Sequence, residues 1–321
     1  MKTVITDYTF PDLGIESGII EAAGHELTGW KGRRTPTEVR QMVADADAVI
    51  TQFAPVNAEV ISAMSKTRVI VRYGIGVDNV DLEAARARGI PVCNVPDYCI
   101  DEVADHTLAF LLSVTRQVVP NTLHVRSGNW GLATPLESLK TLRNLTVGIV
   151  GFGRIGREVA ARLRSFRCRI LVFDPMVSAD VIRQAGAEPA SLSELLQHSD
   201  AVTLHCPSTA ETRGLLNSQS LRLTKPGAII INLARGDLID PDALVEALQS
   251  GHISAAALDV FSPEPIPPGH PILSLPQVVL ASHIASASVP AVQRLRETVA
   301  GLALAALEGR PLNNIVNGVG K

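Results

Sequence analysis

The stretch "LTVGIVGFGRIGREVAARLRSFRCRILVFDP", residues 145–175, decides the fold of this chain. An apolar run leads directly into Gly151, and Gly151, Gly153 and Gly156 form a Gly-x-Gly-x-x-Gly pattern. The apolar residues that follow recur at helical spacing: Ile155, Val159, Leu163 and Phe166. In such a strand, turn and helix the first glycine makes the turn, the second admits a pyrophosphate, and the third lets helix and strand pack closely. The phosphates would lie at the helix N-terminus, so the stretch predicts a dinucleotide site.

The residues after the second apolar run favour NAD over NADP. This run ends at Phe173 and is followed by Asp174. A carboxylate at that point accepts hydrogen bonds from the ribose hydroxyls and would repel a 2′-phosphate. The next residues, 175–177, include no Arg or Lys that could bind the phosphate. An unrelated surface aspartate is the alternative interpretation of Asp174.

Composition narrows the class of protein. A length of 321 residues favours two domains, and a hydrophobic content of 46% indicates a well-buried core. A net charge of −3 without a basic cluster predicts neither a nucleic-acid nor a membrane partner. No apolar run approaches the roughly 20 residues needed to span a bilayer, and the N-terminus does not read as a signal peptide. The four cysteines lack metal-ligand spacing, which predicts a reduced, cytoplasmic protein without a metal site.

The whole chain alternates short apolar runs with helical patterns, which is typical of parallel α/β folds. We expect a connecting helix with Asp101 as its N-cap and a C-terminal helix over 290–307 that ends at Gly309. The segments 45–56 and 198–209 are similar to each other, which indicates two domains built alike or a chance likeness of Val/Ile-rich strands. The predicted strands are 2–6, 48–51, 68–72, 91–94, 146–150, 169–173, 201–205, 228–232, 255–258 and 278–281.

Three polar residues of the second half follow apolar strands: Arg235, Glu264 and His283. The carboxyl ends of parallel strands share one edge of a sheet, so these side chains can converge on a ligand there. An Arg binds a carboxylate bidentately, a His exchanges a proton near neutral pH, and a Glu beside it favours the imidazolium. Taken singly, each has a structural alternative: a turn cap, a solvated loop residue and a core histidine.

Several segments together resemble the D-isomer-specific 2-hydroxyacid dehydrogenase family over essentially the whole chain. They are "RYGIGVDNVDLEAARARGIPVCNVP", "VGIVGFGRIGREVA", "LHCPSTAETRGLLN", "GAIIINLARGDLID", "ALDVFSPEPIPPGHPIL" and "SHIA". The resemblance implies hydride transfer between NAD(H) and a small 2-keto or D-2-hydroxy acid such as hydroxypyruvate or glyoxylate. It implies that Arg235 binds the substrate, that His283 is the acid/base and that Glu264 pairs with it. The substrate carboxylate would meet backbone N–H groups of the loop formed by Tyr73, Gly74, Ile75 and Gly76, beside Arg72.

The resemblance also explains why the glycine loop lies so far into the chain. It implies an α/β protein with two doubly wound parallel-sheet domains, in which a Rossmann-type cofactor domain, 100–287, is inserted into a flavodoxin-like substrate domain, 1–99 and 288–321. The connecting helix and the arm through Trp130 would pack a homodimer. Further cofactor contacts are expected from Thr107, Arg154, Ile155, His205, Cys206, Pro207, Thr212, Leu233, Ala234, His283 and Asp259, the last facing the nicotinamide carboxamide.

Two segments, "NVPDYCIDEVADHT" and "RPLNNIVN", are most similar to the branch that contains the C-terminal-binding-protein corepressors. An NAD(H)-sensing binding protein of that kind is therefore the alternative function. Two departures stand out: Ser282 precedes the histidine where the family usually has proline, and Ser286 stands where the corepressor branch often has tryptophan. Formate dehydrogenases have Gln at the position of Glu264 and are disfavoured. A feedback-regulated phosphoglycerate dehydrogenase is disfavoured, because we expect no regulatory domain after residue 321, while a short form of that enzyme stays an alternative.

Overall fold

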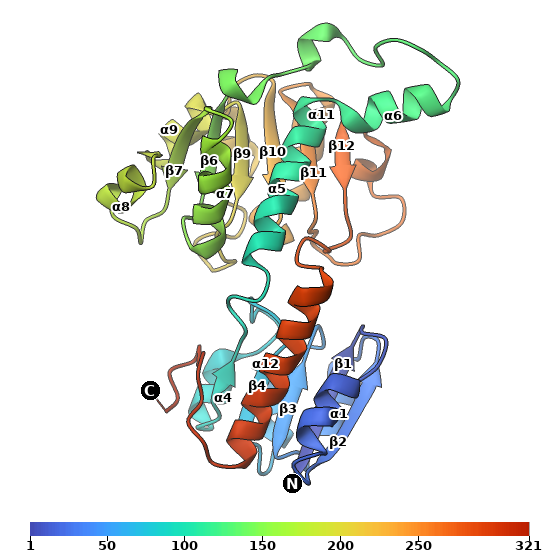
Figure 1. Ribbon diagram of the computed structural model, residues 1–321, viewed down its shortest axis with the longest axis vertical. Coiled ribbons are helices and arrows are strands. Elements are labelled where there is room, and N and C mark those ends of the chain that lie inside the picture. Colours follow the sequence, from blue (N-terminus) through green and yellow to red (C-terminus); the bar gives the residue numbers. More distant parts are fainter. Residues whose placement is uncertain (321) are drawn as a thin grey trace. The chain divides into compact units, whose positions relative to one another are not determined.

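The computed structural model describes residues 1–320, which form two compact units (Figure 1). The first unit is Met1–Tyr98 together with the segment from Ser288 onward, and the second is Cys99–Ala287. Each unit is an α/β structure around its own parallel sheet.

The first unit contains a five-stranded sheet of order β2-β1-β3-β4-β5, the flavodoxin-like order. Every strand pair is parallel. Of these strands, only β2 is missing from the sequence prediction, because it lies at the sheet edge, is only partly buried and shows no apolar run. The strands are β1 (Lys2–Tyr8), β2 (Glu26–Lys31), β3 (Ala48–Thr51), β4 (Val69–Arg72) and β5 (Val92–Cys93). The helices are α1 (Gly14–Ile20), α2 (Pro36–Val43), α3 (Ala58–Ala63), α4 (Leu82–Ala87) and α12 (Val289–Leu307).

The second unit contains a seven-stranded sheet of order β12-β11-β10-β9-β6-β7-β8, all parallel. This is the Rossmann order with β12 added at one edge. The strands are β6 (Thr146–Val150), β7 (Arg169–Phe173), β8 (Glu188–Pro189), β9 (Ala201–Leu204), β10 (Ala228–Asn232), β11 (Ile253–Leu258) and β12 (Val278–Leu280). The edge strand β8 was not predicted, because two residues produce no periodic signal.

Helices cover both faces of this second sheet, and short 3-10 turns join some of the elements. The α-helices are α5 (Ile100–Thr115), α6 (Val118–Arg126), α7 (Arg154–Arg164), α8 (Ala179–Gln184), α9 (Leu192–His198), α10 (Ser218–Arg222) and α11 (Pro241–Gln249). The 3-10 turns are η1 (Leu136–Ser138), η2 (Leu142–Asn144), η3 (Gly236–Leu238) and η4 (Pro271–Ser274).

The start of α5 corrects one prediction. The N-cap is Cys99, without a side-chain capping bond, and Asp101 lies inside the first turn. The Asp101 carboxylate binds Arg162 of α7 instead, at 2.6 Å, because α5 packs along α7. The apolar residues of this helix, Val103 and Leu111 among them, are buried.

The C-terminal helix follows its sequence signals. Ser288 caps α12 by accepting the N–H of Ala291, and a proline occupies the first turn. Gly309 follows the helix with a φ of 71°, the left-handed conformation in which glycine is favoured. The predicted ends of this helix are confirmed.

The internal similarity of 45–56 and 198–209 has a structural counterpart. Asp47 precedes β3 and accepts the backbone N–H of Lys2 at 2.8 Å; Asp200 precedes β9 and accepts that of Thr146 at 2.7 Å. Each carboxylate also binds the ammonium group of a lysine that precedes the next strand. Since β3 and β9 both lie beside the first strand of their sheets, the two segments occupy equivalent places, and the likeness is not a chance one.

Candidate active site

The glycine loop between β6 and α7 leaves room for a pyrophosphate. Gly151 has a φ of 94°, and a Cβ on it would lie 2.6 Å from the backbone nitrogen of Cys206. A Cβ on Gly156 would lie 2.2 Å from the carbonyl oxygen of Gly151, so neither position admits a side chain. At Gly153, by contrast, a Cβ would meet no described atom within 4 Å. Gly153 is also the N-cap of α7 without a side-chain capping bond, so the helix N–H groups stay available for phosphate oxygens.

Asp174 lies beside this loop. Its Oδ2 accepts the N–H of Phe152 at 2.6 Å, and its Oδ1 accepts the N–H of Met176 at 2.8 Å. These two bonds fix the carboxylate at the carboxyl end of β7, and each oxygen retains a lone pair for a ribose hydroxyl. The glycine loop, the uncapped helix and this carboxylate therefore fit NAD.

The residues after β9 form the opposite wall of the glycine turn. His205 and Cys206 provide the backbone atoms nearest to Gly151, and the Thr212 hydroxyl donates to the carbonyl oxygen of Pro207 at 2.7 Å. Burial lowers the pKa of His205 to about 4, and its Nε2 lies 2.9 Å from the Thr203 hydroxyl. His205 is therefore neutral near pH 7 and unsuited to be the proton donor.

The other predicted cofactor residues lie around this sheet edge or in α5. Arg154 and Ile155 begin α7, and Leu233 and Ala234 follow β10. Thr107 is buried in α5, where its hydroxyl donates to the carbonyl oxygen of Val103 at 2.7 Å. Contacts from these residues to the cofactor stay predictions.

A buried asparagine shapes the turn that carries Arg235. Asn232, the last residue of β10, is 1% exposed. Its Nδ2 donates to the carbonyl oxygen of Arg235 at 2.7 Å, and its Oδ1 accepts the N–H of Ala234 at 3.0 Å. Sequence analysis missed this residue, although an Asn that ends an otherwise apolar strand was the available signal.

The Arg235 turn packs closely on the loop that carries Glu264. A Cβ on Gly236 would lie 2.0 Å from the carbonyl carbon of Phe261, so only glycine fits there. The N–H of Phe261 in turn donates to Oε1 of Glu264 at 2.9 Å. The strand ends of β10 and β11 thus bring Arg235 and Glu264 into one neighbourhood, as predicted from the sequence.

Glu264 and His283 form a direct pair. The Nδ1 of His283 lies 2.8 Å from Oε2 of Glu264, and the two side chains are 31% and 23% exposed. Burial acts to raise the pKa of Glu264, but the His283 hydrogen bond and charge, the Phe261 N–H and the Arg235 charge together lower it. Glu264 is therefore a carboxylate near pH 7. With Nδ1 bound to this carboxylate, Nε2 is the second ring nitrogen through which His283 can exchange a proton.

The backbone at His283 is held by Asp259. His283 has a φ of 58°, and its N–H donates to the carbonyl oxygen of Asp259 at 2.7 Å. The Asp259 carboxylate, 1% exposed, accepts the N–H groups of Ile284 and Ala285 at 2.8 and 2.9 Å. These bonds stabilise the loop that carries His283, and the expected contact of Asp259 with nicotinamide stays a prediction.

The loop after β4, in the first unit, is the predicted binding loop for the substrate carboxylate. Tyr73 donates its N–H to Thr51 O at 2.9 Å, and Gly74 donates its N–H to Arg72 O at 2.9 Å. The contact of this loop with the substrate stays a prediction. Within residues 1–320, the N–H groups of Ile75 and Gly76 donate no hydrogen bond.

No helix within residues 1–320 has the length and apolar character needed to cross a membrane. Over the same residues, no three His, Cys, Asp or Glu side chains gather in a way that could hold a metal ion.

Comparisons with known proteins agree with this geometry. Residues 108–285 match the family model "D-isomer specific 2-hydroxyacid dehydrogenase, NAD binding domain". The chain is 40% identical over 308 residues to a glyoxylate reductase of Korarchaeum cryptofilum, covering 94% of this chain and 93% of that protein. It is 39% identical over 289 residues to a D-3-phosphoglycerate dehydrogenase of Mycobacterium leprae, covering 90% of this chain but only 54% of that relative.

Solved structures give the same result. A D-lactate dehydrogenase from Aquifex aeolicus, complexed with NAD and lactic acid, superposes with a TM-score of 0.87 at 28% identity, covering 96% of each chain. These findings confirm an NAD-dependent dehydrogenase that transfers a hydride between NAD(H) and a 2-keto or 2-hydroxy acid. They do not support the corepressor-like alternative, and they do not specifically show the corepressor branch. The chain belongs to the D-isomer-specific 2-hydroxyacid dehydrogenase family.

Proposed function

We propose that this protein reduces a small 2-keto acid, glyoxylate or hydroxypyruvate, with NADH. The observation that carries the proposal is the 2.8 Å contact between His283 Nδ1 and Glu264 Oε2, next to the turn that presents Arg235. The name of the Korarchaeum relative, a glyoxylate reductase, supports the choice of acid.

Each of the three side chains has a separate task. When bound, NADH supplies the hydride that reaches the carbonyl carbon. The protonated His283 donates from Nε2 to the carbonyl oxygen, and Glu264 holds the ring through Nδ1 and favours its charged form. Arg235 binds the substrate carboxylate and stabilises the negative charge that develops on the carbonyl oxygen. We further propose that the first unit offers the N–H groups of Ile75 and Gly76 to a substrate carboxylate.

Steady-state turnover with a panel of 2-keto acids and NADH tests this function. We expect turnover with glyoxylate or hydroxypyruvate, and its loss in His283→Ala, while NADH binding measured by fluorescence is retained in both proteins. Tight NADH binding without turnover of any acid in the panel would contradict the proposal.

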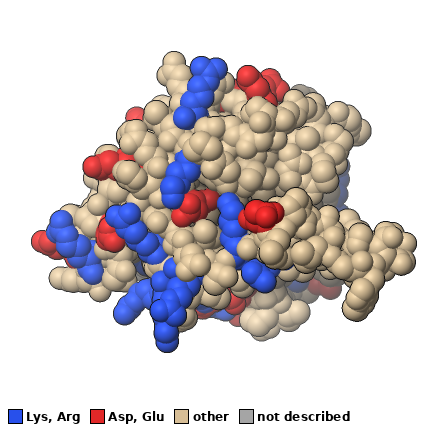
Figure 2. Space-filling model, turned by 90° about the horizontal axis from the view of Figure 1, so that it is seen from above, with Lys and Arg blue, Asp and Glu red and all other residues tan. Residues whose placement is uncertain are grey.

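We also propose that the protein is a homodimer assembled through α6 and the segment that follows it. None of the described residues of α6 is buried. Residues 127–136 contain no Lys, Arg, Asp or Glu. Figure 1 places α6 at the right of the second unit, and the lobe on the same side of Figure 2 is almost without charged side chains. The exposed apolar side chains here are Val118, Val119, Leu123, Val125, Trp130, Leu132 and Leu136. Such a patch indicates a protein interface.

Sedimentation velocity of Trp130→Glu tests this assembly, since Trp130 is 91% exposed in the chain by itself. We expect the wild type to sediment as a dimer and the variant to shift toward monomer. A monomeric wild type would contradict the assembly.

A cytoplasmic location is also proposed, because Cys93, Cys99, Cys168 and Cys206 form no disulfide among residues 1–320.

A further inference from the structure

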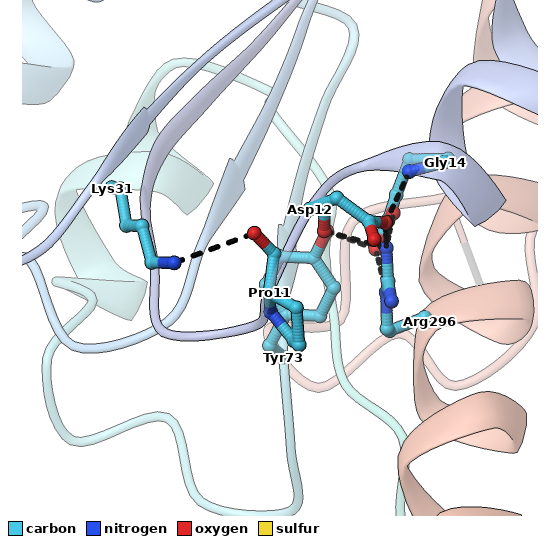
Figure 3. A network of polar contacts seen from close by, with 7 residues as sticks. Pro11, Asp12, Gly14, Lys31, Tyr73 and Arg296 are labelled. Carbon is cyan, nitrogen blue, oxygen red and sulfur yellow. Dashed lines mark hydrogen bonds and ion pairs between the residues drawn. The ribbon is translucent and has the colours of Figure 1, made fainter.

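A buried polar cluster in the first unit includes Tyr73, the first residue of the loop 73–76; Figure 3 labels two of its members, Tyr73 and Arg296. It consists of Glu16 on α1, Tyr73 directly after β4, and Arg296 on α12, and we name these three residues the Tyr73 cluster. They are 0%, 2% and 6% exposed. Figure 3 shows Arg296 extending from α12 toward Asp12, whose carboxylate also accepts the N–H of Gly14.

The three side chains satisfy one another. The Tyr73 hydroxyl donates to Oε1 of Glu16 at 2.8 Å. Arg296 donates to both carboxylate oxygens of Glu16, at 2.9 Å from Nε and 2.6 Å from Nη2, and Nη2 also donates to the carbonyl oxygen of Asp12 at 2.8 Å. The Arg296 guanidinium lies 5.0 Å from the centroid of the Phe10 ring, which meets the Tyr73 ring edge-on at 5.2 Å.

This arrangement is an inefficient way to stabilise a fold. Removing two charges from water costs about as much as their mutual attraction returns, and apolar side chains of similar volume often stabilise a protein equally well. Burial and the nearby Glu16 carboxylate raise the pKa of Tyr73 well above its usual range, so the hydroxyl remains a donor. The hydrogen bond from the Tyr73 hydroxyl to the Glu16 carboxylate fixes the orientation of the Tyr73 side chain. We therefore consider what this orientation does to the backbone loop that begins at Tyr73.

Tyr73 carries the loop that we propose for substrate binding. Its backbone N–H is bound to Thr51, and the following residues are held by Val95, whose N–H donates to Gly74 O at 3.0 Å, and by Asn94, whose Nδ2 donates to Ile75 O at 2.7 Å. The side chain of Tyr73 is thus the fourth attachment of this loop, in which the N–H groups of Ile75 and Gly76 donate no hydrogen bond within residues 1–320.

We propose that Tyr73, Glu16 and Arg296 are positioning residues that set the direction of the Ile75 and Gly76 N–H groups for the substrate carboxylate. The inference rests on the proposed function, because it assigns to these N–H groups the carboxylate of a 2-keto acid. None of the three touches the substrate; they act through the backbone of the loop.

Tyr73→Phe is the main test, because it removes the hydroxyl and keeps the ring and the Glu16–Arg296 pair. We expect the KM for the keto acid to rise roughly tenfold, the worth of weakening one charge-assisted hydrogen bond. The KM for NADH should stay unchanged, and kcat should fall less than the keto-acid KM rises. Glu16→Gln is the second variant, and we expect it to move the keto-acid KM in the same direction.

Asn317→Ala is the matched control. Asn317 is buried in the same unit, donating to Ile90 O at 2.8 Å and accepting from Val92 N at 3.1 Å, without a bond to residues 73–76. We expect this variant to lower Tm and leave the keto-acid KM as in the wild type. A Tyr73→Phe enzyme that loses stability like the control but keeps its keto-acid KM would overturn the inference.

Amide hydrogen exchange separates this inference from the proposed function, because it needs no turnover. The bonded N–H groups of Tyr73 and Gly74 should exchange at least about tenfold faster in Tyr73→Phe than in the wild type or in Asn317→Ala. Unchanged exchange would refute the positioning role, whatever the enzyme turns over. Faster exchange in a protein that turns over no keto acid would instead count against the proposed function alone.

Discussion

Replacing Glu264 by Gln tests the proton donor of this enzyme. In the proposed mechanism His283 donates the proton, so we expect the rate of reduction to fall at high pH. Glu264 lies 2.8 Å from Nδ1 and is negative near pH 7, since its pKa is lowered from its usual value. Its negative charge stabilises the positive charge that the His283 ring carries when it acts as the proton donor. Glutamine keeps the size and a hydrogen-bond acceptor but removes the charge, so the alkaline limb should move to lower pH.

The size of this movement follows from the geometry of the pair. A hydrogen bond to a charged group contributes about 1.5–3 kcal/mol, and one pH unit corresponds to about 1.4 kcal/mol. With both side chains less than one third exposed, we expect the loss of this interaction to lower kcat/KM on the alkaline side by roughly ten- to a hundredfold. The acidic side should change little, because Glu264 loses its charge only as pH falls below the usual glutamate range.

The assay is kcat/KM for the keto acid against pH, with NADH saturating. His283→Ala is the reference variant, and it should lose on the order of 10²- to 10⁴-fold at every pH, the usual worth of a positioned acid. An alkaline limb that stays in place in Glu264→Gln, or near-normal rates in His283→Ala, would show that the donor has been misassigned.

Three further predictions concern the residues around this pair. Arg235→Ala should raise the KM for the keto acid and also lower kcat, because the guanidinium both binds the carboxylate and stabilises the transition state; unchanged steady-state kinetics would place this residue outside the site. Asn232→Ala should lower kcat/KM for the keto acid about tenfold, because the two hydrogen bonds of the Asn232 side chain shape the Arg235 turn. A keto-acid kcat/KM equal to that of the wild type would contradict this role. NADH should support much faster reduction than NADPH, because the Asp174 carboxylate repels the 2′-phosphate of NADPH. Asp174→Ala removes this repulsion and should bring the kcat/KM values for the two cofactors closer together. Equal kcat/KM for both cofactors in the wild type would exclude the assigned role of Asp174.

Two features of the site could be predicted from the sequence, because they depend on residues that follow one another along the chain. The glycine pattern lies between a buried strand and an amphipathic helix, and those three elements are continuous in the chain. Arg235, Glu264 and His283 follow strands of one parallel sheet, whose carboxyl ends share an edge by geometry. To predict that these three side chains lie together, it was enough to locate the ends of the strands in the sequence.

Other features depended on which segments meet in three dimensions. The edge strands β2 and β8 carry no periodic apolar pattern, and their pairing with β1 and β7 defines them. Asn232 and Asp259 are ordinary polar residues in the sequence, and their burial against backbone groups makes them supports of the Arg235 and His283 turns.

The Tyr73 cluster shows the difference most clearly. Glu16 and Arg296 lie 280 residues apart in the chain, and nothing in either neighbourhood predicts that they meet. The sequence by itself predicted the fold class, the cofactor and the three side chains that we propose for the reaction, because periodicity and strand ends are local signals. The tertiary structure alone decided which buried charges pair and which N–H groups of the loop remain for a ligand, since both depend on how α1, β4 and α12 pack together.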